Sequence, residues 1–106
     1  MQLANAPLAI VVAVNPELTD VWIEDASIIS IIIQLMAQSQ GLGSSWIQSR
    51  ERFTQENESV SSYIKGILDL PENYLVESII AIGYPDEEKE PHNPDLILDK
   101  VHYNKF

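Results

Sequence analysis

Apolar runs and polar breaks follow one another along the chain in an order that predicts strands and helices in alternation. The run Leu8–Val14 is wholly apolar and rich in β-branched residues, and Asn15 and Pro16 end it. We expect a strand there that is buried on both faces, with helices above and below it. The segments at residues 44–48 and 76–83 predict a second and a third strand.

The segment from Asp20 to Gln40 has the spacing of a long helix. Polar residues recur there every three or four positions and leave one narrow polar stripe on an otherwise apolar surface: Ser27, Ser30, Gln34 and Gln38. Five isoleucines between residues 28 and 33 favour a strand by propensity, but length and polar spacing favour a helix, capped by Asp20 and Gly41. A helix that is apolar on nearly all sides must be covered on most of them, so we expect a second subunit around it.

A second helix is indicated after the polar loop of residues 50–57. Its apolar positions follow helical spacing: Val60, Tyr63, Ile64, Ile67 and Leu68. Ser59 or Asn57 can cap its start, and Pro71 lies just beyond its end. Residues 91–106 form an extended tail with isolated apolar side chains, which needs a surface of its own domain or of a partner. We expect one domain, residues 1–106, in the order β-α-β-α-β with a long buried central helix.

Composition narrows the possible functions. The chain has 106 residues and 45% hydrophobic content, enough for a core. Sixteen acidic residues against six basic ones give a net charge of -10, which disfavours nucleic acids and anionic membranes as partners. The absence of cysteine excludes disulfides and fits a reducing compartment. Since the start does not resemble a signal peptide and no apolar run is long enough to span a bilayer, we expect a cytoplasmic protein.

The residues by themselves indicate no catalytic constellation. Gly41-Leu42-Gly43 follows a helix and opens a strand, which is opposite to the order in phosphate-binding glycine loops, so a helix cap and turn are favoured. His92 and His102 have no partner at metal-ligand spacing, so we expect no metal site. The absence of a recognisable catalytic constellation is compatible with a cofactor enzyme, in which the protein mainly positions the cofactor.

Three segments, taken in order, resemble the C-terminal half of the nitroreductase family, whose members are FMN-dependent enzymes that take hydride from NAD(P)H. The segments are Trp22–Ser27, Gly41–Ile47, and Leu70–Glu72 followed by Ile79–Pro85. The resemblance covers essentially the whole chain. It implies an α+β, nitroreductase-like fold, an intertwined homodimer around the long helix, and FMN at the subunit interface.

The resemblance also implies cofactor-binding positions. Trp46, Ile47, Gln48 and Ser49 match the strand that runs under the flavin ring, where backbone groups contact the ring edge. His92 lies where many members carry a basic pair that holds the FMN phosphate, and it is followed by Asn and Pro. Family members usually begin with a helix whose arginines grip FMN. No such segment lies ahead of Leu3 in the printed sequence, so we expect a fragment, a shortened gene product, or an N-terminal half that is supplied elsewhere. With a net charge of -10, we expect weak FMN binding by this chain alone.

Three functions follow from these observations. The first is an FMN-dependent oxidoreductase of nitroreductase type, which passes hydride from NAD(P)H through the flavin to a nitroaromatic, quinone or similar acceptor. The alternative is a flavin-free, shortened nitroreductase-like module that serves dimerisation or interaction. A small acidic binding domain unrelated to flavins is the third, and it requires the three-segment match to be chance.

Overall fold

The computed structural model describes residues 6–85, 91, 93, 95 and 98–106. The elements are β1 (Leu8–Val14), α1 (Trp22–Ser39), β2 (Gly43–Gln48), α2 (Val60–Leu68), β3 (Leu75–Gly83) and the 3-10 helix η3 (Leu98–Lys100). The predicted order β-α-β-α-β and the α+β class are therefore confirmed, and element bounds agree with the prediction to within about two residues.

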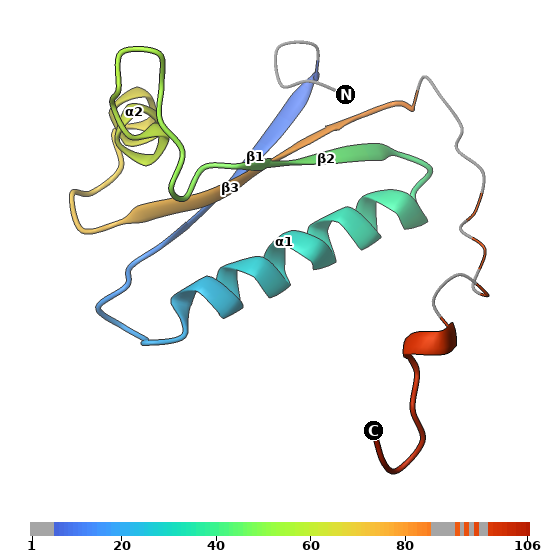
Figure 1. Cartoon of the computed structure of the whole chain (residues 1–106). Helices are drawn as coiled ribbons and strands as arrows, with labels where there is room; N and C mark the ends of the chain where they lie inside the picture. Colours follow the sequence, from blue (N-terminus) through green and yellow to red (C-terminus); the bar gives the residue numbers. More distant parts are fainter. Residues whose placement is uncertain (1–5, 86–90, 92, 94, 96–97) are drawn as a thin grey trace.

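The three strands form one antiparallel sheet in the order β1-β3-β2 (Figure 1). The central strand β3 is buried from Val76 to Gly83. β1 lies at an edge, where only Val12 is buried and Leu8 is 52% exposed. The prediction that β1 is buried on both faces is wrong for the single chain, because α1 leaves an open groove along one face of β1 and α2 packs against β3 instead.

The two helices lie on opposite sides of the sheet, with α1 along one face and α2 beside the start of β3 (Figure 1). The Ser59 Oγ accepts the Ser62 N–H at 3.1 Å, which confirms Ser59 as the cap of α2. The prediction of Asp20 as the cap of α1 is wrong. The helix starts two residues later, its N-cap is Val21, and no side chain accepts a hydrogen bond from the first turn.

The end of α1 is closed by backbone hydrogen bonds around Gly41. The Leu42 N–H donates to the Ala37 carbonyl at 2.9 Å, and the Gly41 N–H donates to the Gln38 carbonyl at 3.0 Å. This is a Schellman motif, and the φ of Gly41 is +77°, which glycine adopts without a steric cost. The glycine pair therefore ends a helix and leads into β2, as predicted.

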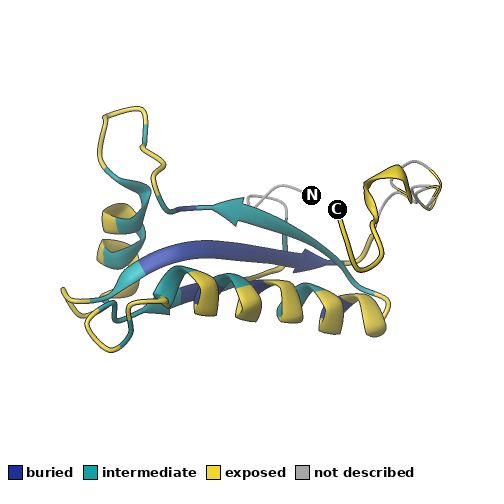
Figure 2. Ribbon diagram, turned by 60° about the horizontal axis from the view of Figure 1, so that its bottom comes forward, coloured by how far each residue is buried: buried dark blue, intermediate teal, exposed yellow. Residues whose placement is uncertain are grey.

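α1 presents Ser27, Ser30 and Gln34 of its polar stripe to the sheet, whereas Gln38 and most of its apolar residues are exposed. Ser30 is fully buried, and Gln34 donates to the Ser44 Oγ of β2 at 3.2 Å. The large apolar side chains on the outer face are between 45% and 62% exposed: Ile28, Ile29, Ile31, Ile32, Leu35 and Met36. We call these six residues the outer face of α1. Figure 2 shows the contrast between the exposed turns of α1 and the buried β3. The expected burial of this helix is thus not reached within a single chain.

The core on the α1 side of the sheet is small. Its buried members are Ala37, Ile80 and Ile82, and Ile10, Ile33, Leu42 and Trp46 pack against them. In the C-terminal segment, the described apolar residues are exposed, and Tyr103 and Phe106 have almost no cover. No helix in the described part of the chain is long and apolar enough to cross a membrane.

Candidate functional site

The predicted flavin-binding residues lie on β2 and directly after it, but their side chains do not point to one place. Trp46 packs against the core under α1, and its Nε1–H donates to the Gln48 Oε1 at 3.2 Å on the same face. Ile47 pairs with Ile79 of β3, and strand alternation places it on the opposite face. These residues share a stretch of backbone, and the contact of its groups with a flavin ring stays a prediction.

β2 is an edge strand, which determines what its backbone can do. β3 pairs with one side of it, and in the described residues no strand pairs with the other side. An edge strand presents a row of N–H and C=O groups that are not used by the sheet. Such a row can hydrogen-bond to a planar heterocycle placed along it, so the geometry of β2 fits the ring edge of a flavin.

Ser49, the last of the four residues, is held rigidly at the end of β2. Its N–H and that of Arg50 both donate to the Glu77 carbonyl at 3.0 Å. The residue is 1% exposed, and its Oγ has no hydrogen-bond partner among the described residues. A buried hydroxyl without a partner is uncommon.

A β-bulge in β3 places the carboxyl group of Glu77 between the sheet and α1. Val12 pairs with Ser78 and Ala13 with Val76, so Glu77 is the extra residue. Ser27 of α1 donates to the Glu77 Oε1 at 2.9 Å. Glu77 is 2% exposed, and its Oε2 has no partner in the described part of the chain. The bulge thus turns this carboxylate toward α1 and out of the alternating pattern.

Next to Glu77, a pair of serines completes a buried polar seam between α1 and β3. The Ser30 Oγ lies 2.7 Å from the Ser78 Oγ, and it donates to the Ala26 carbonyl at 2.7 Å. No role was predicted for Glu77 or Ser78 from the sequence. The available signal was the polar stripe of α1 together with the adjacent polar residues Glu77 and Ser78 inside an otherwise apolar strand.

The histidines add little to this site. His92, predicted to contact the FMN phosphate, lies outside the described residues. His102 stacks on Phe106 with ring centroids 4.6 Å apart in the C-terminal segment. Within the described residues, no group of three or more His, Asp or Glu side chains is placed to hold a metal ion.

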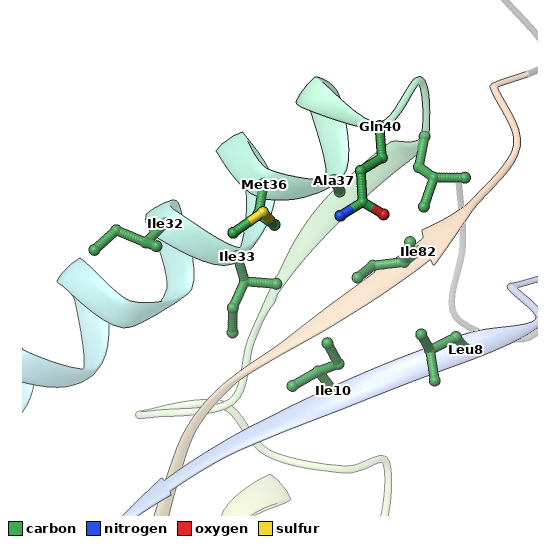
Figure 3. A pocket seen from close by; sticks show the side chains of 9 residues that line it. Leu8, Ile10, Ile32, Ile33, Met36, Ala37, Gln40 and Ile82 are labelled. Carbon is green, nitrogen blue, oxygen red and sulfur yellow. The ribbon is translucent and has the colours of Figure 1, made fainter.

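A second candidate site is an apolar groove between α1 and β1, with a volume of about 330 Å³ (Figure 3). Its lining is apolar apart from one glutamine: Leu8, Ile10, Ile32, Ile33, Met36, Ala37, Gln40, Leu42 and Ile82. Ile33 of α1 and Ile10 of β1 point toward each other across it (Figure 3). Because Ile32 and Met36 also belong to the outer face of α1, the groove and that face form one continuous apolar surface.

The sequence is similar to curated proteins from archaea. A putative NADH dehydrogenase/NAD(P)H nitroreductase from Archaeoglobus fulgidus is 34% identical over 98% of this chain and 60% of its own length. A protein of the same description from Methanothermobacter thermautotrophicus is 33% identical over 96% of this chain and 52% of its own length. No family model matches the sequence.

Solved structures show the same likeness. An FMN-dependent nitroreductase from Clostridium difficile R20291 superimposes with a TM-score of 0.88 and 53% identity, over 96% of this chain and 60% of that one. A nitroreductase with bound FMN from Desulfitobacterium hafniense DCB-2 has a TM-score of 0.69 at 24% identity, over 97% of this chain and 53% of that one, and shows the fold alone. The chain thus spans between half and two thirds of the length of these relatives.

Proposed function

Because the chain belongs to the nitroreductase family, we propose that it is the flavin-side part of an FMN-dependent oxidoreductase. In this proposal hydride passes from NAD(P)H to the flavin and then to a nitroaromatic, quinone or similar acceptor. The observation that carries it is the match to the FMN-dependent nitroreductase from Clostridium difficile, with 53% identity and a TM-score of 0.88 over nearly the whole chain.

In this proposal the protein positions the cofactor, and FMN, when bound, supplies the two-electron redox chemistry. The outer edge of β2, from Trp46 to Gln48, offers backbone groups to the ring. Ser49 is buried and its N–H is fixed on the Glu77 carbonyl, so in this proposal it holds the end of the strand edge in place beside the ring. The bulge at Glu77 supports the function indirectly, because its carbonyl fixes the Ser49 and Arg50 amides.

We propose further that two chains associate through the outer face of α1 and the groove beside it. Complete burial of an isoleucine or leucine contributes about 1.5–3 kcal/mol, so covering the exposed half of each of the six side chains contributes about 1 kcal/mol. Six such side chains on each chain amount to about 6 kcal/mol per chain before the cost of association. The exposed apolar residues of the C-terminal segment offer additional surface for a partner.

A flavin-free dimerisation or interaction module is the second candidate. The observation in its favour is that six large apolar side chains of α1 are between 45% and 62% exposed in the single chain. In this case the outer face of α1 would still be covered by a second chain, and the edge of β2 would remain without a cofactor.

An anaerobic visible spectrum of the purified chain, recorded with added FMN and then with NAD(P)H, separates the two candidates. The oxidoreductase predicts a bound-flavin spectrum that NAD(P)H bleaches and a quinone or nitroaromatic acceptor restores. The module predicts a stable dimer that leaves the spectrum of free FMN unchanged. A monomer that ignores FMN would contradict both candidates.

A further inference from the structure

The only two arginines of the sequence lie together, directly after the proposed flavin strand. They are Arg50 and Arg52, two of the six basic residues in the chain. The net charge of the chain is -10. In such a field, an anionic ligand needs a local source of positive charge. Both arginines lie beside Ser49 and are therefore a local source of positive charge next to the proposed flavin strand.

The two arginines occupy a tight turn whose backbone is anchored on both sides. The Arg52 N–H donates to the Ser49 carbonyl at 3.1 Å, so Ser49 to Arg52 form a four-residue turn, which we call the arginine turn. The Arg50 N–H donates to the Glu77 carbonyl at 3.0 Å, and the Arg52 carbonyl accepts the Val60 N–H at 2.9 Å. The turn is thus tied to β3 and to the start of α2.

The third position of the arginine turn has an unfavourable backbone conformation. Glu51 has a φ of 58°, in the left-handed region that glycine adopts more readily. A strained residue of this kind persists only where its surroundings hold it, and it is often found at ligand sites. Here it lies between the two arginines.

Both guanidinium groups contact this one residue. The Arg50 Nη2 lies 3.5 Å from the Glu51 Oε1, and the Arg52 Nη1 donates to the Glu51 carbonyl at 3.2 Å. The Arg50–Glu51 pair is exposed, at 34% and 73% for the two side chains, so it is weak. A phosphate monoester has up to two negative charges and three acceptor oxygens, and it competes well for such a pair.

We propose that the arginine turn binds the phosphate monoester of a nucleotide, with Glu51 as the internal competitor. The source that we infer is the 2′-phosphate of NADPH, because the resemblance assigns the 5′-phosphate of FMN to the position of His92. The inference therefore rests on the proposed function, and binding of the FMN phosphate is an outcome that the test distinguishes. Phe53 follows the turn and is 63% exposed, which offers a flat apolar face to a ring of the same nucleotide.

Affinity ratios test the site, because each ratio compares ligands that differ by one phosphate. The pairs are FMN against riboflavin and NADP⁺ against NAD⁺, measured by calorimetry on the whole chain at constant ionic strength. Arg50→Gln and Arg52→Gln should each lower one of the ratios by about fivefold, the loss of one charge-assisted hydrogen bond at a partly exposed site. Glu51→Gln should raise the same ratio by about threefold, since it removes the competing charge.

Lys100→Gln is the matched control, because it removes one positive charge from an exposed residue outside the turn. It should change both ratios by less than about twofold. A changed FMN ratio assigns the site to the flavin phosphate, and a changed NADP⁺ ratio assigns it to the dinucleotide. Unchanged ratios in both arginine variants, or no binding of any of the four ligands, would overturn the inference.

The outcomes also separate this inference from the proposed function. A chain that prefers NADP⁺ in an arginine-dependent manner but binds neither flavin would support the arginine turn and contradict the oxidoreductase. A chain that binds FMN and riboflavin equally, with both ratios unaffected by the variants, would support the oxidoreductase and contradict the arginine turn.

Discussion

Replacing Ile32 by aspartate places a carboxylate in the middle of the outer face of α1. In the single chain Ile32 is 53% exposed, so folding alone buries about half of its side chain. Covering the other half in a dimer contributes about 1 kcal/mol. A carboxylate buried without a partner costs several kcal/mol more, and a symmetric dimer contains the residue twice.

We therefore expect Ile32→Asp to raise the dissociation constant of the dimer at least about a thousandfold, which corresponds to about 4 kcal/mol. The far-ultraviolet circular dichroism should stay unchanged, because the substituted position is half exposed in the folded chain. Sedimentation velocity over a concentration series measures the dimer. Ile67→Asp is the matched control, since Ile67 is 61% exposed on α2, outside this face. If the two variants dimerise equally well, the outer face of α1 is not the interface.

Three further predictions concern stability. Glu77→Gln replaces a buried carboxyl group, whose Oε2 lacks a partner in the described residues, by an amide that is less costly to bury, so the Tm should rise by several degrees, or about 1 kcal/mol; a fall in Tm would contradict this account of the seam. Gly41→Ala should lower the free energy of unfolding by about 1 kcal/mol in a urea titration, because the φ is +77° while no atom lies within 4 Å of the added Cβ. An unchanged urea midpoint would show that the helix end rearranges. Ser59→Ala should cost about 1 kcal/mol through loss of the cap of α2, whereas the exposed Ser62→Ala should be neutral, and equal effects of the two would argue against the cap.

Local patterns were sufficient to predict the elements. The apolar run from Leu8 to Val14 and the helical spacing from Val60 to Leu68 match strand and helix as observed. Gly41 was correctly placed at a helix end, since its position after a helical pattern and before a strand excludes a phosphate loop. These features depend on neighbours within a few residues, which a sequence displays directly.

Features that depend on distant parts of the chain were not predictable. The spacing of α1 defined a polar stripe and an apolar face, but it could not show that most of the polar stripe faces the sheet. Glu77 faces α1 only because a bulge interrupts the alternation of β3, and no residue near it signals a bulge. The two-sided burial expected for β1 belongs to β3, because strand order is decided by pairing between segments far apart in the sequence.

The arginine turn shows a similar limit for the candidate site. The polar composition of residues 50–57 predicts a loop, and nothing in it connects Arg50 with Glu77 or Arg52 with Val60. The hydrogen bonds that make those connections join three elements. The predicted positions on β2 remain a prediction, because what the structure adds is an available strand edge and a buried Ser49.

Sedimentation velocity of the chain with FMN, recorded at one wavelength absorbed by protein and one absorbed only by flavin, tests the central claim most directly. We predict that the flavin signal moves with the dimer, and that in Ile32→Asp it stays behind with free FMN while the chain sediments as a monomer. Flavin that never sediments with the wild-type dimer, or that moves equally well with a monomer, would contradict a flavin site that depends on two chains joined through α1.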